Sequence, residues 1–198
     1  NGGSGAGIEE VEALMEVAGE FLLAGPFIDS CVIAPILLAH ATLTDFTEQL
    51  LRDIASGESI VAVAGCGKTG DWIAAPEVQA LQNGDTWSLA GQAHFVSYAH
   101  VADKCIVYAN SDQGVGVFLV NMDAPGITVN LHRSSDPTQR LSTLTFEGVD
   151  AQALPDVDAK VRAEALSNGL VALAGQQVGG SQRIFELTID YLKTRHQF

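Results

Sequence analysis

The sequence predicts an α+β fold in which helices flank an antiparallel β-barrel or sandwich. Apolar residues recur at helical spacing up to about residue 57, alternate with polar residues from Ser59 to about Leu154, and return to helical spacing from about Asp158. The strand-like part contains no long helical pattern, whereas the strands of a parallel α/β sheet need helical crossovers. The expected order of elements is therefore α, then β, then α.

Three helices are expected in the first part of the chain. The first ends at Gly25-Pro26, a strong helix breaker, and carries an apolar stripe made of Ile8, Val11, Leu14, Met15, Ala18, Phe21 and Leu22. A second, nearly apolar helix covers about residues 28–41, and Pro35 marks a kink or a restart within it. A third, amphipathic helix covers about residues 45–55 and stops at Ser56-Gly57.

Six or more short strands are expected in the middle of the chain, because six segments are rich in Val, Ile and aromatic residues. They cover about residues 59–65, 86–99, 104–111, 115–122, 127–133 and 142–149. Turn-forming residues separate several of them, namely Asn83-Gly84-Asp85, Asp112-Gln113-Gly114 and residues 123–126.

The final helical pattern runs from about Asp158 to the end of the sequence. A helix of about 40 residues would extend roughly 60 Å, which is too long to be stable alone. It therefore needs partners in a helical bundle. Gly175, Gly179 and Gly180 allow close packing against such a partner, or a bend.

The composition excludes several classes of protein. Hydrophobic residues make up 47% of the 198 residues, which indicates a packed globule. The formal net charge of −14 argues against binding to nucleic acid, which needs a cationic surface. No apolar run reaches the roughly 20 residues of a membrane span, and the first residues do not form a signal peptide, so a cytoplasmic location is expected.

The three cysteines do not indicate a metal site or a disulfide framework. Cys31, Cys66 and Cys105 are odd in number and lack the spacing of metal ligands. We expect them to be buried free thiols in a reducing compartment, and we expect no metal.

Residues 62–69 (AVAGCGKT) formally match the relaxed Walker A pattern of phosphate-binding loops. Such a loop needs a helix directly after it, because the N-terminus of that helix faces the phosphates. Here Gly70-Asp71-Trp72 leads to Pro76 and then to the Asn83-Gly84 turn. A P-loop nucleotide-binding protein is thus an alternative that the surrounding sequence does not favour.

The same segment, with two others, resembles the acyl-CoA dehydrogenase family of flavoproteins. It fits the family pattern V-T-E-P-x-A-G-S-D through Val63, Gly67 and Asp71. Ala64 stands where the family usually has Thr, and Gly70 where it has Ser, so two hydroxyl groups are missing. Gly65-Cys66 replaces the usual Glu-Pro.

The other two segments lie further along the chain. Phe95, Val96 and Ser97 take the Trp, Ile and Thr places of the family stretch K-x-W-I-T-N-A-x-x-A-D-x-x-x-V, and Ala102-Asp103 fit its later part. At the end of the sequence, the family motif YxxxRxQFGxPI is matched by Tyr191, Arg195, Gln197 and Phe198. The start of the sequence is similar to the family segment PEEYGGSGAG, so we expect the middle part of a longer protein.

The resemblance implies a set of cofactor-binding residues for FAD, namely Val63, Ala64, Gly70, Phe95, Val96, Ser97, Arg195, Gln197 and Phe198. It also implies that Gly70 contacts the substrate. An aromatic ring at Phe95 would lie beside the flavin and the Ser97 hydroxyl would reach its N5. Periodicity alone instead makes Phe95 and Val96 ordinary strand residues, with the aromatic ring inward, and Ser97 a satisfied hydroxyl. Arg195 would reach the pyrophosphate of a partner subunit's FAD, because a guanidinium pairs phosphate oxygens in a bidentate manner; the alternative is a solvated charge on a helix.

No catalytic residue is assigned from the sequence. The five histidines show no paired spacing and are expected to be surface or capped core residues. Related enzymes place a Glu base either early in the helix after the barrel or beyond the point where this sequence stops. The early position falls near Ser167-Asn168-Gly169, which contains no carboxylate.

Taken with this resemblance, the chain is expected to be the central part of an acyl-CoA dehydrogenase. Residues 1–57 would end an N-terminal helical domain, residues 58–157 would form the middle β-barrel, and residues 158–198 would begin a C-terminal helical domain. The implied activity is α,β-dehydrogenation of an acyl-CoA thioester, with FAD as cofactor and an electron-transfer flavoprotein as electron acceptor, in a homo- or hetero-tetramer. The missing hydroxyl groups raise an alternative, a non-catalytic or FAD-deficient partner subunit of an α2β2 enzyme.

Overall fold

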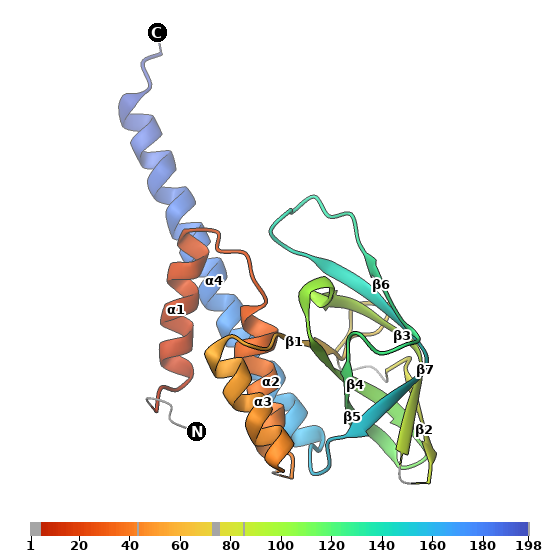
Figure 1. Cartoon of the computed structure of the whole chain (residues 1–198). Helices are drawn as coiled ribbons and strands as arrows, with labels where there is room; N and C mark the ends of the chain where they lie inside the picture. Colours follow the sequence, from red (N-terminus) through yellow and green to blue (C-terminus); the bar gives the residue numbers. More distant parts are fainter. Residues whose placement is uncertain (1–4, 43, 73–75, 85, 198) are drawn as a thin grey trace.

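The computed structural model of the chain describes residues 5–42, 44–72, 76–84 and 86–197. It consists of a group of helices beside a β-barrel, and the long last helix runs past the first one into solvent (Figure 1). The elements follow the expected order of helices, strands and helix.

The helical part comprises a first helix, a π-helix that continues into an α-helix, and two further helices. Their bounds are α1 (Ile8–Glu20), η1 (Ile28–Ile33), α2 (Ala34–His40), α3 (Asp45–Ser56) and α4 (Ala159–Thr194). Pro35 lies in the first turn of α2, directly after the point where the π-helix η1 changes to an α-helix without a break. At the predicted end of α3, Gly57 adopts a left-handed conformation with φ of 79° and closes the helix.

The barrel is built from seven strands and one short 3-10 helix. Their bounds are β1 (Val61–Ala64), β2 (Gln79–Asn83), β3 (Thr86–Ser97), η2 (Ala99–Val101), β4 (Lys104–Ser111), β5 (Gly114–Asn121), β6 (Ile127–Leu131) and β7 (Leu141–Ala153). Antiparallel pairing connects β2 to β3, β3 to β7, β7 to β5 and β5 to β4. The pairing of Gln79 in β2 with Asn110 in β4 closes the circle. The predicted antiparallel barrel is confirmed, and β1 joins it by parallel pairing to the first half of β4.

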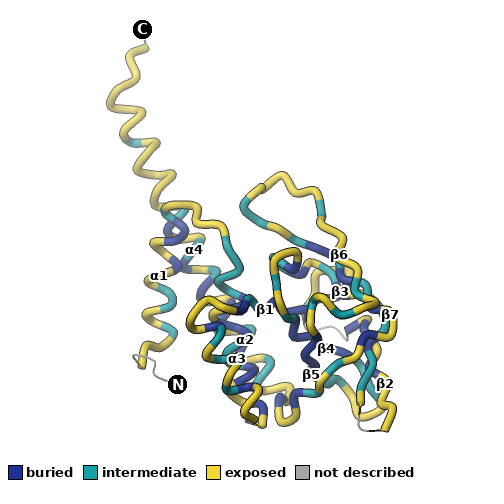
Figure 2. The backbone as a smooth tube through the Cα atoms, viewed as in Figure 1, coloured by how far each residue is buried: buried dark blue, intermediate teal, exposed yellow. Residues whose placement is uncertain are grey.

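Two large cores hold the barrel and the helices together, and a smaller third core of Met15, Ala18, Val32 and Ala172 joins α1 and η1 to α4 (Figure 2). The barrel interior is lined by fully buried side chains from all its main strands, including Leu89, Val96, Val107, Leu144 and Phe146. A second core joins the outer face of β1, β4 and β5 to the helices. Because β1 contributes alternate residues to each core, its position between helices and barrel is fixed from both faces.

Helices α1 and α4 cross at very short range because glycines stand at the crossing. A Cβ atom placed on Gly179 would lie 1.8 Å from the carbonyl oxygen of Glu16, and one on Gly19 would lie 1.9 Å from that of Gln176. Gly175 is equally constrained, by the carbonyl of Glu12 at 2.7 Å. The expectation of close packing at Gly175 and Gly179 is thus confirmed, whereas Gly180 lies beside the contact.

Several expectations about local structure were wrong. Strand β2 was missed because its sequence, QALQN, has no β-branched or aromatic residue and buries only Ala80. In α1 the apolar stripe is half right: Met15 and Ala18 are buried, but Leu14 is 70% exposed. Helix α1 also stops at Glu20, so Phe21 and Leu22 lie outside it and are exposed.

Candidate functional site

The loop after β1 contains no helix in its described residues, Gly65 to Trp72. It folds instead as a turn in which the Gly70 amide donates to the Gly67 carbonyl at 3.0 Å. Lys68 is exposed, and its backbone N–H donates to the Glu77 carboxylate at 3.1 Å. A P-loop would aim that amide at phosphate with a helix behind it, so the P-loop interpretation was wrong.

The structure brings the loop after β1 and the middle of β3 together. The His94 amide donates to the Cys66 carbonyl at 3.1 Å, which extends the contact between these segments beyond the end of β1. The Ala64 and Val96 side chains are both 1% exposed and face the barrel core. Since this exposure is that of the whole residue, a ligand outside the barrel meets the residues next to Ala64 and Val96 and not these two residues themselves.

Phe95 lies in a β-bulge. His94 and Phe95 of β3 together oppose the single residue Thr143 of β7, since the register shifts between Ala93 and Val96. The backbone of Phe95 adopts φ of 54°, a left-handed conformation that is strained for an aromatic residue. The bulge turns the Phe95 ring outward, where it is 38% exposed, instead of inward as strand periodicity predicts.

Ser97 lies at the end of β3, where the barrel meets the helices. It borders a cavity of about 50 Å³ with Tyr98, Asp29 of η1 and Gln176 of α4. Within the described part of the chain, the Ser97 hydroxyl makes no side-chain hydrogen bond. Tyr98 takes φ of 51°, and its amide donates to the Arg140 carbonyl at 2.7 Å, so the strand stops at Ser97 and not at residue 99 as expected.

Asp29 is a buried carboxyl that the sequence reasoning did not single out. It is 7% exposed, and loss of solvation raises its pKa to about 7, against a small opposing effect from a hydrogen bond with the Val63 backbone. A polar residue within the helical segment IDSCVI was the available signal. Its proximity to β1 could not be deduced from the sequence.

Gly70 of the same loop is exposed and has φ of 81°. A Cβ atom placed there would meet nothing within 4 Å, so the backbone stands in open space. A ligand can therefore approach the Gly70 main chain closely, although the hydroxyl usual at this place is absent.

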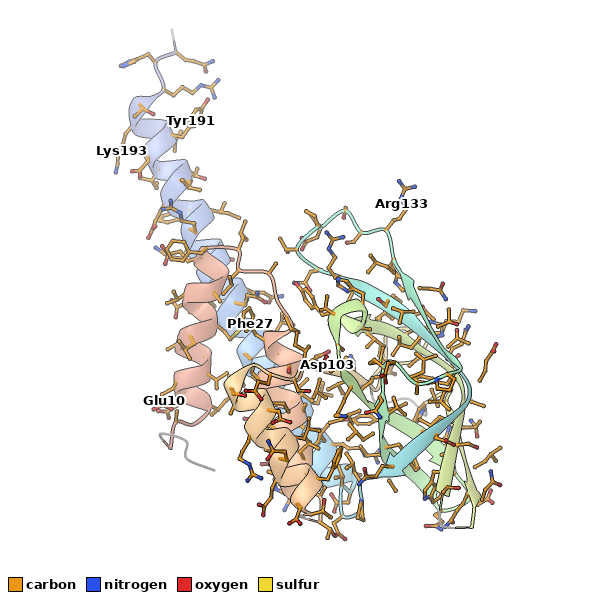
Figure 3. The ribbon with its side chains drawn as sticks, viewed as in Figure 1. Glu10, Phe27, Asp103, Arg133, Tyr191 and Lys193 are labelled. Atoms are coloured by element: carbon orange, nitrogen blue, oxygen red, sulfur yellow. The ribbon has the colours of Figure 1, made fainter. Side chains whose placement is uncertain are left out.

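The segment around Arg195 lies far from the loop after β1 and from the end of β3 within this chain. Arg195 follows the last turn of α4, and its guanidinium carbon lies 5.3 Å from the centre of the Tyr191 ring. Tyr191 and Lys193 project from the part of α4 that extends beyond α1, away from the barrel (Figure 3). Gln197 is also exposed, and Phe198 lies outside the described residues.

The structure offers no carboxylate at the expected early position of the base. Gly169 is buried, where a Cβ atom would lie 2.8 Å from Ile33, and the Asn168 side chain donates to the Glu164 carbonyl at 2.9 Å. Among the described residues, no group of three or more His, Cys, Asp and Glu side chains could hold a metal ion.

One cysteine differs from expectation, and two histidines share a contact that their spacing in the sequence did not indicate. His94 and His132 are distant in sequence, yet both contact the Thr143 hydroxyl. Cys66 and Cys105 are buried free thiols as expected, but Cys31 is exposed. Burial raises the pKa of the Cys105 thiol.

Comparison with known proteins gives the family. No protein-family model matches the chain. The chain is 30% identical to acyl-CoA dehydrogenase FadE27 of Mycobacterium tuberculosis over 200 residues, which cover all of the chain and 52% of that relative. The chain belongs to the acyl-CoA dehydrogenase family. It is also 26% identical to the mitochondrial short-chain specific acyl-CoA dehydrogenase of Rattus norvegicus. That match covers 98% of the chain and 52% of the relative.

Solved structures of acyl-CoA dehydrogenases agree with this assignment. The chain is similar to the Tcur3481–Tcur3483 steroid ACAD variant, with a TM-score of 0.85, 30% identity and coverage of 100% of the chain and 53% of that structure. Similarity to the ChsE4–ChsE5 complex of Mycobacterium tuberculosis gives a TM-score of 0.88 and 28% identity, again over 100% and 53% of the two chains. The chain thus spans about half the length of the acyl-CoA dehydrogenases that it matches. No helix in its described residues is both long and apolar enough to cross a membrane.

Proposed function

We propose that the protein containing this chain is an FAD-dependent acyl-CoA dehydrogenase that introduces an α,β double bond into an acyl-CoA thioester. The observation that supports this most directly is the hydrogen bond between the His94 amide and the Cys66 carbonyl, 3.1 Å long. It places the loop after β1 and the bulge of β3 at one edge of the barrel. These are the two segments that resemble the flavin-binding segments of the family.

The residues at this edge fit a flat, partly aromatic ligand. Phe95 presents an exposed ring, Ser97 a hydroxyl group at the rim of the cavity, and Gly70 an accessible backbone. We propose that these three residues hold the isoalloxazine ring of FAD against the strand ends formed by Val63, Ala64 and Val96. When bound, FAD supplies an acceptor for the hydride that leaves the β-carbon.

This chain's own residues would orient the reactants and exclude water. Ser97 would donate its hydroxyl proton to the ring system, while Phe95 covers one face of the ring. The Gly70 main chain lies open to the substrate as well as to the cofactor, which suits its expected contact with the thioester. No described residue at the early position of α4 can remove the α-proton, so the base belongs elsewhere in the protein.

The partners follow from the position of Arg195. Arg195 is the C-cap of α4, and the C-terminal end of α4 lies away from the barrel of its own chain (Figure 1). We propose that Arg195 binds the FAD pyrophosphate of a neighbouring subunit in a tetramer, with Gln197 and Phe198 beside it. An electron-transfer flavoprotein would accept the electrons.

The test is the flavin of the purified full-length protein. We expect an absorption band in the visible blue region that bleaches when an acyl-CoA is added without oxygen. A colourless protein that takes up no added FAD contradicts the proposal.

A second candidate is an FAD-deficient partner subunit in an α2β2 enzyme. It is favoured by the missing hydroxyls at Ala64 and Gly70 and by the cavity beside Ser97, which at about 50 Å³ has room for only a few water molecules. One similar structure, the ChsE4–ChsE5 complex, contains two different subunits. Co-expression with a paralogous partner and a count of flavins per tetramer distinguishes the candidates, since four FAD exclude the second and two support it.

A further inference from the structure

Four side chains form a continuous polar chain behind the outward-facing ring of Phe95. His132 Nε2 lies 2.8 Å from the Thr143 hydroxyl oxygen, which lies 3.3 Å from His94 Nδ1. His94 Nε2 in turn lies 3.6 Å from the Glu77 carboxylate. We call Glu77, His94, Thr143 and His132 the histidine chain.

The proton count gives this chain a direction. The Thr143 hydroxyl has one proton, so it can donate to only one of the two neutral rings and must accept from the other. If it donated to His132, the Nε2 atom of a neutral His94 would turn a bare lone pair toward the Glu77 carboxylate, and that atom is buried without a hydrogen bond. With the opposite order, His132 donates to Thr143, Thr143 donates to His94, and the N–H at Nε2 of His94 points toward Glu77. Only this order makes every contact attractive when both rings are neutral.

The histidine chain contacts both segments of the proposed flavin site. His94 precedes Phe95 in the bulge, and the His132 ring meets the Phe95 ring edge-on with 5.7 Å between ring centres. The second oxygen of the Glu77 carboxylate accepts from the Lys68 amide at 3.1 Å, in the loop after β1. One hydroxyl group, that of Thr143, therefore joins the two rings that flank Phe95.

We propose that the histidine chain positions the Phe95 ring, and the loop after β1, for contact with the flavin. This proposal rests on the proposed function, because it assumes that the Phe95 ring meets the flavin. The strained backbone of Phe95 needs support from its surroundings to persist. The fixed orientation of His94 and His132 supplies that support from two sides.

Strand β7 offers a matched pair of substitutions. Thr143→Val removes the hydroxyl with little change of volume, and Thr143→Ser keeps it. Thr145→Val is the control, since Thr145 lies two residues away on the same face, is similarly half-buried, and accepts one hydrogen bond from Gln92 of β3 at 3.1 Å. Each valine variant loses one hydrogen bond between β7 and β3, and Thr143→Val also loses the bond with His132. Only Thr143→Val breaks the histidine chain.

The experiment uses the full-length protein with FAD. For Thr143→Val we expect FAD to bind roughly five- to tenfold more weakly, because the Phe95 ring loses its support, and the visible flavin spectrum to shift. Thr143→Ser should restore both properties, and Thr145→Val should leave both at wild-type values. In flavin-free protein, ¹⁵N NMR of the rings should show that wild-type His132 carries its proton on Nε2 and His94 on Nε2, and that this arrangement is lost in Thr143→Val.

The outcomes separate this proposal from the proposed function. If wild-type protein binds FAD and Thr143→Val binds it equally well with an unchanged spectrum, the positioning role is wrong while the proposed function stands. An equal loss of affinity in Thr143→Val and Thr145→Val would also overturn it, because the effect would then be one of general stability. If wild-type protein binds no FAD, both proposals fail.

Discussion

The Ser30 hydroxyl accepts a hydrogen bond from the Val61 backbone N–H at 3.1 Å, and both residues are buried. Val61 belongs to β1, whose other edge pairs with β4. Without Ser30, the free edge of β1 would leave a buried N–H unsatisfied. A helical side chain therefore takes the place of a neighbouring strand, and it joins the helices to the barrel.

The first prediction concerns this contact. Ser30→Ala should lower the free energy of unfolding by about 1–3 kcal/mol, because it leaves the Val61 N–H buried without a partner. Denaturation of the purified variant in urea measures the change. Ser181→Ala is the control, since the exposed Ser181 hydroxyl donates only to a carbonyl of its own helix. Equal stability of the two variants would contradict the role of Ser30.

The second prediction concerns the pH dependence that Asp29 confers. Its pKa is raised from 3.8 to about 7 by burial, so the folded protein holds a proton that the unfolded chain releases. This group therefore makes the fold less stable as pH rises from about 4 to about 7, and adds no further change above that range.

Asp29→Asn removes this charge, and the amide oxygen can still accept a hydrogen bond from the Val63 backbone. We expect the free energy of unfolding of the variant to equal that of the wild type near pH 4 and to exceed it near pH 8. The excess should be at most about 4 kcal/mol, which corresponds to the change in the pKa of Asp29 from 3.8 to about 7. The difference between the two unfolding free energies, measured across this pH range, checks the sign. A difference that does not grow with pH would show that Asp29 is ionised in the fold.

The third prediction uses adjacent glycines of α4. Gly179→Ala should destabilise the protein by several kcal/mol or separate α1 from α4, because the new Cβ would lie 1.8 Å from the Glu16 carbonyl oxygen. Gly180→Ala has its nearest neighbour at 3.5 Å, so it should be neutral or stabilise the helix by up to about 1 kcal/mol. Thermal unfolding of both variants provides the comparison. Similar unfolding midpoints would argue against the close contact of α1 with α4 at Gly179.

The fourth prediction tests the proposed role of Arg195. Arg195→Lys keeps the positive charge but loses the bidentate fork, so the flavin content per subunit should fall while secondary structure is unchanged. Arg183→Lys is the matched control on the same helix, where Arg183 pairs with Glu186 at 3.7 Å on the surface. Flavin absorbance relative to protein absorbance gives the result. Equal flavin content in both variants would show that Arg195 is a solvated charge.

The flavin-related residues show how far sequence reasoning reached. The motif matches selected Phe95 and Ser97, and the hydrogen bond between His94 and Cys66 joins their strand to the loop after β1. Periodicity assigned the Phe95 ring to the interior. The bulge at His94 and Phe95 reverses that, and a bulge depends on how β3 meets β7, which residues within β3 do not encode.

The sequence by itself determined the overall order of helices, then strands, then a helix, and the antiparallel class of the sheet, because periodicity and turn formers act locally. It left open whether the sheet closes into a barrel, and whether Gly175 and Gly179 serve close packing or a bend. Only the tertiary structure decided which distant groups meet: Ser30 with the edge of β1, and His94 with His132 through Thr143. The physical reason is that a buried hydrogen-bonding group must find a partner, and the identity of that partner depends on chain segments that approach each other only after the barrel has closed.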